Sequence, residues 1–217
     1  MMGDNVDDVE LEAMDKDSLI QVVKKLKGEL AKKTDDFIRV TNLRLYHLER
    51  AQNLSLQYNR RESFEIAGIP DHIEQEKLED EVLEIAKEAK VSVNRQFLKK
   101  ADIVACHRIG KRGNVVCRVV NRKFSRECIF NGRNLKNSKR YGEGTKLYIN
   151  DSFCPEFRFI NYVVRTAKSS NEIYRWKVRN GVHSVQKNEG DRFTQIGHVL
   201  DLQNIGVTVP LRNDRPN

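Results

Sequence analysis

The residues best able to do chemistry form a cationic cluster in the middle of the chain. Between Arg108 and Arg140 there are eleven Lys or Arg residues and one acid, Glu127. Side chains of this charge and density bind polyanions such as nucleic acid through contacts with phosphate. The stretch also contains apolar patterns such as 115–120, which a disordered basic tail would lack. We therefore expect this charge to lie on a folded surface.

Basic residues of this cluster and of the segment after it are the candidates for contact with nucleic acid. They are Arg108, Lys111, Arg112, Arg118, Arg122, Lys123, Arg133, Lys139, Arg140, Arg158, Arg165, Lys168, Arg175, Lys177 and Arg179. Two basic surfaces on adjoining small domains would form a cleft for a single strand. Four aromatic residues are candidates to stack on bases, with packing in a core or at its rim as the alternative: Tyr141, Tyr148, Tyr174 and Trp176.

Catalysis and metal binding find little support in the sequence. The five histidines form no HExxH pair, and no Gly-rich loop is followed by Lys and Ser or Thr. Cys106 and His107 are neighbours on a predicted strand, so their side chains point to opposite faces, which disfavours a thiolate dyad. The four cysteines form no CxxC pair, and we interpret them as small core residues. We expect a protein that is not an enzyme, with no metal and no other cofactor.

Six predicted elements position the basic cluster in a domain over residues 61–151. They are a strand at 64–69, a helix with Leu78, Val82, Ile85, Ala86 and Ala89 on one face, strands at 103–109 and 115–120, a helix at 123–133 and a strand at 146–150. The order β-α-β-β-α-β is that of the ferredoxin-like fold, which RNA-recognition motifs share. The first helix is acidic, so the domain is expected to have two electrostatic sides.

The predicted sheet lacks the central aromatic residues on which RNA-recognition motifs usually stack bases. With Phe64 and Ile66 in the core, Glu65 points outward, and Val116 and Arg118 point outward from the other central strand. None of these outward residues is aromatic. We therefore expect binding to the backbone of a strand, with its sequence largely unread.

Residues 18–60 are predicted to form a coiled coil. Apolar residues follow a 4-3-4 spacing as far as Leu30. The pattern then loses its phase and resumes from Ile38 onward, which indicates a stutter. The segment from Arg44 to Glu49 resembles the trimerisation motif of parallel three-stranded coiled coils, in which Arg44 pairs with Glu49 of the next chain. The alternative is a long amphipathic helix that folds back on its own globular domain. The residues predicted to mediate oligomerisation are Leu19, Val23, Leu26, Leu30, Ile38, Arg44, Leu45, Leu48 and Glu49.

A second small domain is predicted over residues 152–210, which makes the whole chain an α+β protein. Ser152 is expected to cap a helix with an apolar stripe, and Asn180-Gly181 predicts a hairpin after an alternating segment. The apolar runs 196–202 and 205–209 are expected to complete a small sheet.

Two tails are expected outside these domains, at residues 1–17 and 211–217. The first carries seven acids and one lysine, against a net charge of +8 for the whole chain, and we expect it to shield the basic surfaces until nucleic acid displaces it. No apolar run approaches the ~18 residues of a membrane helix, and the N-terminus lacks the features of a signal peptide. These observations predict a protein of the cytoplasm or nucleus, without a membrane or small-molecule partner.

Four segments resemble the first open-reading-frame proteins of metazoan LINE-type retrotransposons. They are residues 60–70, 106–111, 116–120 and 147–155. The resemblance runs from about residue 18 to residue 210 and includes the succession of coiled coil, RNA-recognition motif and C-terminal domain. The last third is also similar to the C-terminal domain of baculoviral few-polyhedra proteins.

The first resemblance implies a homotrimer that binds single-stranded RNA or DNA between its two small domains. This binding would show little preference for sequence. It further implies nucleic-acid chaperone activity in the ribonucleoprotein of a transposable element. By position in the matching segments, Arg118 and Arg158 are the best candidates for nucleic-acid contact, followed by Arg108. The second resemblance implies instead a virus-like structural or nuclear-egress protein that acts through protein contacts.

Overall fold

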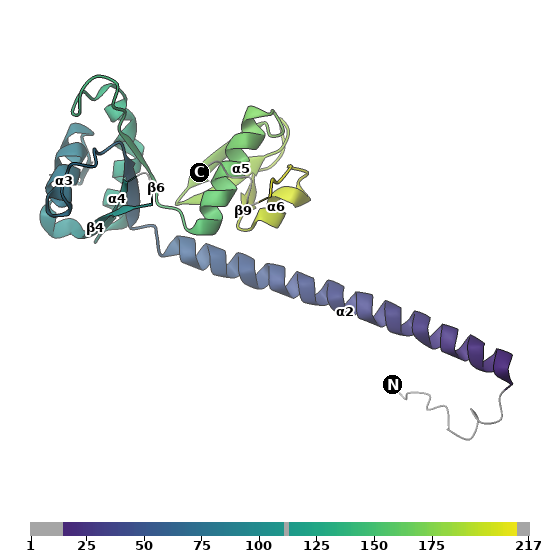
Figure 1. The fold of residues 1–217 in the computed structure, drawn as a ribbon. Helices are drawn as coiled ribbons and strands as arrows, with labels where there is room; N and C mark the ends of the chain where they lie inside the picture. Colours follow the sequence, from purple (N-terminus) through teal and green to yellow (C-terminus); the bar gives the residue numbers. More distant parts are fainter. Residues whose placement is uncertain (1–14, 111–112, 212–217) are drawn as a thin grey trace. The chain divides into compact units, whose positions relative to one another are not determined.

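The computed structural model describes residues 15–110 and 113–211, and it mixes helices with antiparallel sheets (Figure 1). The chain divides into two units, residues 1–48 and residues 49–217. A long helix, α2 (Lys16–Tyr58), begins in the first unit and ends in the second. The expected α+β class and long N-terminal helix are therefore confirmed, whereas the domain boundaries stay predictions.

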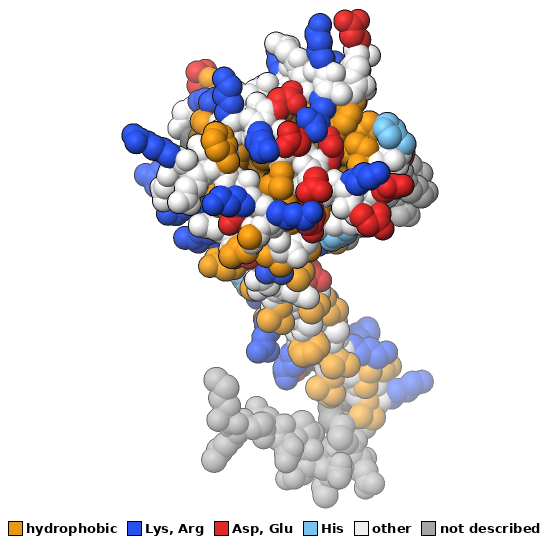
Figure 2. All heavy atoms as spheres, turned by 90° about the vertical axis from the view of Figure 1, so that its left-hand side faces the viewer, with side chains coloured by type: hydrophobic (Ala, Val, Ile, Leu, Met, Phe, Trp, Pro, Cys, Tyr) orange, Lys and Arg blue, Asp and Glu red, His pale blue; other side chains and the backbone are white. Residues whose placement is uncertain are grey.

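Helix α2 leaves most of its apolar side chains in solvent. Asp15 precedes it, and its Oδ1 accepts hydrogen bonds from the backbone N–H groups of Asp17 and Ser18 at 2.9 and 3.1 Å. Leu30 and Leu48 are 67% and 68% exposed, and hydrophobic side chains are visible in orange on the surface of the helix in Figure 2. These exposed side chains gain little tertiary stabilisation within the chain.

Four antiparallel strands form the larger sheet, in the order β4-β5-β1-β6. Their bounds are β1 Ser63–Ala67, β4 Ile103–Ile109, β5 Asn114–Val119 and β6 Tyr148–Asp151. Helices α3 (Leu78–Glu88) and α4 (Arg122–Asn131) each bury one apolar face in the same core as β1 and β5. The helices and strands predicted for this region are thus present in the expected order.

Several short elements of this region were not predicted. They are η1 (Gln75–Lys77), the hairpin of β2 (Ser92–Val93) and β3 (Gln96–Phe97), η2 (Lys100–Asp102) and η3 (Gly132–Asn137). Helix α4 ends at Asn131 and continues as η3, two residues before the predicted end of the helix. Strand β6 begins at Tyr148, two residues after its predicted start.

The C-terminal part has its own core and a three-stranded sheet in the order β7-β8-β9. Its elements are α5 (Pro155–Ser169), β7 (Arg175–Arg179), β8 (Val182–Gln186), β9 (Thr194–Ile196) and α6 (Val199–Asn204). Asn180 and Gly181 have positive φ angles of 54° and 73° between β7 and β8, which confirms the predicted hairpin. Cys154 occupies the N-cap of α5, so the prediction that Ser152 caps this helix is wrong.

The expectation of strands at 196–202 and 205–209 is also wrong. Only Ile196 of the first run belongs to a strand, and the run continues into α6. His198 starts this helix, because its Nδ1 accepts a hydrogen bond from the backbone N–H of Leu200 while Asp201 accepts one from the N–H of His198. Periodicity does not separate a short apolar strand from a buried helical turn.

Candidate nucleic-acid interface

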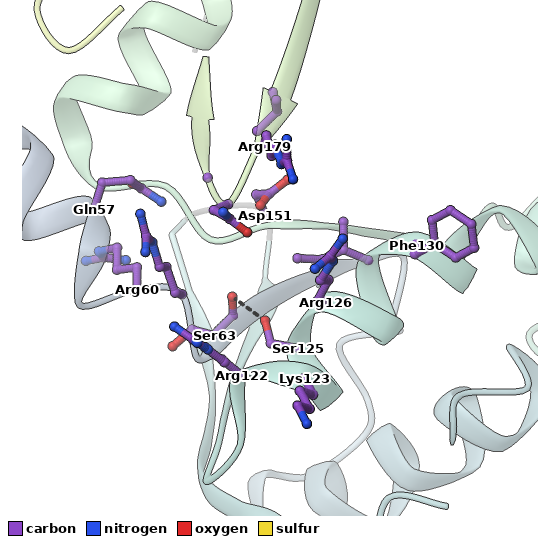
Figure 3. A pocket seen from close by; sticks show the side chains of 15 residues that line it. Gln57, Arg60, Ser63, Arg122, Lys123, Ser125, Arg126, Phe130, Asp151 and Arg179 are labelled. Carbon is purple, nitrogen blue, oxygen red and sulfur yellow. Dashed lines mark hydrogen bonds between the residues drawn. The ribbon is translucent and has the colours of Figure 1, made fainter. Parts of the chain in front are cut away.

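A pocket of about 450 Å³ brings six cationic side chains together, and we call it the basic pocket (Figure 3). The six cations come from the turn after α2, from the start of α4 and from the end of β7, and they are Arg60, Arg61, Arg122, Lys123, Arg126 and Arg179. Asp151, at the end of β6, is the one acid among the residues that line it.

The capping of α4 sets the position of three of these cations. The side chain of Asn121 accepts a hydrogen bond from the backbone N–H of Lys123 at 2.9 Å, so the helix begins at Arg122. Arg122 and Arg126 are four residues apart and therefore share one face of the helix. On the inner face, Ser125 is fully buried and donates a hydrogen bond to the backbone carbonyl of Ser63 at 3.2 Å, which fastens α4 to β1 (Figure 3).

The two cations of the turn after α2 have few partners of their own. The Arg60 guanidinium donates a hydrogen bond to Ser152 Oγ at 3.3 Å. The guanidinium carbon of Arg61 lies 4.3 Å from the centre of the Tyr58 ring. Its Nε is buried and has no hydrogen-bond partner among the described residues. A buried cationic donor without an acceptor is costly, so an anionic oxygen at this place would stabilise the site.

Gln57 joins three segments that form the walls of the pocket. Its Nε2 donates to the carbonyl of Ser152 at 3.0 Å, and its Oε1 accepts from the backbone N–H of Cys154 at 2.9 Å. A Cβ atom on Gly181 would lie 2.4 Å from Gln57 Nε2, so the β7–β8 turn packs directly against the same amide. This close packing positions Arg60 and Arg179 at one pocket.

The charges of the basic pocket are poorly neutralised. Within the described residues, none of its six cations forms a salt bridge with a carboxylate. Burial raises the pKa of Asp151, and a hydrogen bond from the backbone of Gly181 partly opposes that rise. Six cations around one partly buried carboxyl group generate a positive potential that favours phosphate.

The two cations that the retrotransposon resemblance favours lie outside this pocket and are paired. Arg118 donates to Glu62 Oε2 at 3.2 Å, and Arg158 donates to Glu65 Oε2 at 3.1 Å. Glu65 pairs with Val116 across β1 and β5, so these residues share a face of the sheet. Val116 alternates with the core residues Val115 and Cys117, so it lies on the outward face of the sheet as expected, and it is 9% exposed there.

Arg108 has a structural role that its sequence position did not reveal. Its guanidinium donates to the backbone carbonyls of Ile69, Pro70, Ile73 and Gly113 at distances from 2.6 to 3.3 Å. These bonds use most of its donors to fix the loop after β1 and the residue that precedes β5. Arg108 therefore binds backbone carbonyl groups and is not among the residues that line the basic pocket.

Several other predicted cations also have partners within the protein. Arg140 forms an ion pair with Glu81, which lowers the pKa of that carboxyl and raises the pKa of the guanidinium. Lys168 donates to the carbonyl of Tyr174 at 2.8 Å. The remaining contacts are those of Lys139 with Glu143, Lys177 with Phe193 and Arg133 with Phe130.

The structure therefore brings only part of the predicted set together. Arg122, Lys123 and Arg179 line the basic pocket, Arg165 and Arg175 are exposed elsewhere, and Lys111 and Arg112 lie outside the described residues. Arg60, Arg61 and Arg126 were missed. The helical spacing of Arg126 from Arg122 was an available signal, whereas nothing local linked Arg60 and Arg61 to α4.

The four predicted stacking residues also differ in their surroundings. The ring of Trp176 stacks on His183 at a centroid distance of 5.8 Å and packs against the second core, and Tyr141 is partly buried beside Glu81. Tyr174 is 44% exposed and donates to Glu189. Tyr148 is 51% exposed on β6, which leaves it the most accessible of the four.

The cysteines lie in the two cores, as predicted. All four are free and buried, and burial raises the pKa of Cys128 to about 12. The Cys128 thiol is therefore unreactive near neutral pH. No group of three or more potential metal ligands occurs in residues 15–110 and 113–211, and no helix in these ranges is long and apolar enough to cross a membrane.

Fold and site together define a mixed helix-and-sheet protein with a long N-terminal helix and a basic pocket. No protein-family model matches the chain, and a search of curated proteins gives no match either.

Proposed function

We propose that this protein binds single-stranded RNA or DNA with little sequence preference and acts as a nucleic-acid chaperone. The observation that carries the proposal is the basic pocket, in which six cations have no carboxylate partner in the described part of the chain. Phosphate groups would supply the missing negative charge. Since arginine and lysine contacts to phosphate carry no sequence information, binding of this kind is tolerant of sequence.

The topology of the larger sheet supports an RNA-recognition-motif-like, ferredoxin-like domain. Strands β1 and β5 are central in the order β4-β5-β1-β6, and the two helices follow β1 and β5 in the chain. Together with the resemblance to retrotransposon proteins, this arrangement favours a role in packaging retrotransposon RNA into a ribonucleoprotein. The fold alone would not decide it, because ferredoxin-like domains have many functions.

The exposed apolar residues of α2 support self-association. Leu26, Leu30, Leu45 and Leu48 are at least half exposed, and they belong to the seam predicted from the sequence. Association of three helices along this seam would bury these side chains. A trimer would also carry three basic pockets, so one RNA that engages several of them would bind with increased avidity.

A salt titration with a fluorescent single-stranded RNA of about 20 nucleotides tests the proposal. We expect the affinity to fall steeply with salt, with a slope of about −0.7 for each phosphate neutralised. The triple variant Arg122→Gln, Arg126→Gln, Arg179→Gln should lose at least roughly tenfold in affinity and show a shallower slope.

The matched control removes the same charge from exposed positions of α2, through Lys24→Gln, Lys27→Gln and Lys32→Gln. We expect a much smaller loss for this control. Salt-independent binding by the unaltered protein, or equal losses in the two triple variants, would reject the proposal.

A further inference from the structure

A second pocket of about 540 Å³ lies along the edge strand β6. Three cations and no acid are among the residues that line it, and these residues are Gly132, Arg133, Lys136, Asn137, Lys146, Leu147, Tyr148 and Ile149. None of the three cations forms a salt bridge with a carboxylate of the described chain. This second pocket therefore also favours anionic ligands.

The two pockets adjoin the same continuous segment, the end of α4 and the η3 turn after it. Phe130 lines the basic pocket, and Arg133, three residues later, lines the second pocket. In Figure 3, Phe130 lies on the opposite side of the basic pocket from Gln57. Gly132 allows this segment to approach β6, since a Cβ atom there would lie 3.0 Å from Ile149 Cβ.

Two aromatic side chains with exposed surface accompany these cations. Phe130 is 58% exposed, and the guanidinium carbon of Arg133 lies 4.2 Å from the centre of its ring. Tyr148 is 51% exposed and lines the second pocket. Exposed rings beside cations that have no carboxylate partner in the described chain match the two halves of a nucleotide, because a base stacks on the ring while its phosphate contacts the cation.

We propose that Phe130 and Tyr148 are base-stacking platforms for an unpaired strand that continues from the basic pocket into the second pocket. This inference rests on the proposed function and specifies the ligand as a strand with free base faces. In a duplex each base is already stacked between its neighbours, so its face is not available to either ring. The aromatic residues would therefore distinguish single strands from duplexes, whereas the cations would bind both.

The test compares two single strands of equal length, a uridine homopolymer and the same sugar-phosphate chain without bases. The double variant Phe130→Ala, Tyr148→Ala should bind the uridine strand roughly tenfold or more weakly than the unaltered protein. Its affinity for the strand without bases should be unchanged, because the phosphate contacts remain. Phe130→Tyr, Tyr148→Phe should restore binding of the uridine strand, since both positions again carry a ring.

Phe97→Ala is the matched control, because Phe97 is 56% exposed on β3 and lines neither pocket. We expect this control to bind both strands like the unaltered protein. The stacking role would be overturned if the double alanine variant lost equal affinity for the two strands, or lost none for the uridine strand. The proposed function would still stand in that case, provided that the unaltered protein binds both strands. Failure of the unaltered protein to bind either strand would reject the proposed function and this inference together.

Discussion

Gln57 accepts a hydrogen bond at 2.9 Å from the backbone N–H of Cys154, a residue 97 positions further along the chain. The same amide donates to the carbonyl of Ser152 at 3.0 Å and is 1% exposed. A side chain near the end of α2 thus satisfies two backbone groups of the connection between β6 and α5. This arrangement fixes the geometry on which the basic pocket depends.

Replacement of Gln57 by alanine should strongly destabilise this part of the protein. Two buried backbone groups would lose their partners, at a cost of about 2 to 4 kcal/mol. Urea denaturation followed by circular dichroism measures the change. Gln52→Ala, at an exposed position of the same helix, should cost far less, and similar losses in the two variants would show that the hydrogen bonds contribute little.

Gly181→Ala should destabilise the protein through both backbone strain and contact with Gln57. Gly181 has a φ of +73°, and an added Cβ would lie 2.4 Å from Gln57 Nε2. Gly190 has a φ of +86° with no atom near its Cβ position, so Gly190→Ala reports the strain alone. We expect Gly181→Ala to be the more destabilising, by about 1 to 3 kcal/mol.

A double-mutant cycle separates the two contributions at Gly181. In the Gln57→Ala background the Cβ of Gly181→Ala no longer meets the amide, so its additional cost should shrink to that of Gly190→Ala. Full additivity of the two substitutions would contradict the contact.

The stability of the C-terminal part should fall as the pH is lowered from about 6.5 towards 4. His183 is fully buried, and desolvation with the nearby charge of Arg165 lowers its pKa from 6.5 to about 4. Between these values the unfolded chain takes up a proton that the folded protein excludes, which favours unfolding by roughly 3 kcal/mol in total. Above pH 6.5 both states are neutral at this residue, and the contribution is constant.

Thermal unfolding at several pH values checks this dependence. His183→Phe should reduce the change in melting temperature with pH. This substitution also removes the contact of His183 Nε2 with Asn161 Oδ1 at 3.1 Å. His107→Gln changes an exposed histidine, and the melting temperature of this variant should depend on pH as it does in the unaltered protein. A slope that persists in His183→Phe would assign the effect to other groups.

Glu65→Gln should strengthen binding of a single strand. Arg158 pairs with Glu65 at 3.1 Å. The neutral glutamine side chain would leave the charge of Arg158 without this partner, and its amide oxygen would still accept a hydrogen bond from Asn114. We expect affinity to rise about two- to fivefold at low salt, less at high salt. Glu84→Gln on α3, which removes the same charge from an exposed pair with Lys87, should have a smaller effect, and weaker binding by Glu65→Gln would contradict the prediction.

Polar substitutions in the predicted seam of α2 should dissociate the oligomer. Leu45→Asn with Leu48→Asn places amides where a three-stranded coiled coil would bury leucine. Light scattering should then give the mass of one chain instead of three. Leu43→Asn, at an exposed position outside that seam, is the control, and a single-chain mass for the unaltered protein would reject the coiled-coil prediction.

Local patterns were sufficient to predict most helices and strands. The apolar face of α3, the alternation of β7 and the Asn180-Gly181 turn depend on neighbours close in sequence, which is where periodicity and turn preferences act. The same reasoning failed over residues 196–209, because the capping contacts of His198 and Asp201 outweighed an apolar run that is compatible with either structure.

Composition and periodicity were enough to predict a basic surface on a folded α+β framework that follows a long helix. Which cations have no carboxylate partner could not be predicted in this way, because it depends on contacts between distant parts of the chain. Arg108 is bound to loop carbonyls and Arg140 is paired with Glu81. In contrast, Arg60 and Arg179 are far apart in the chain but line one pocket together with Arg122 and Arg126. The reason is physical, because the free charge of a side chain depends on the partners within a few ångströms of it, and folding alone brings distant partners that close.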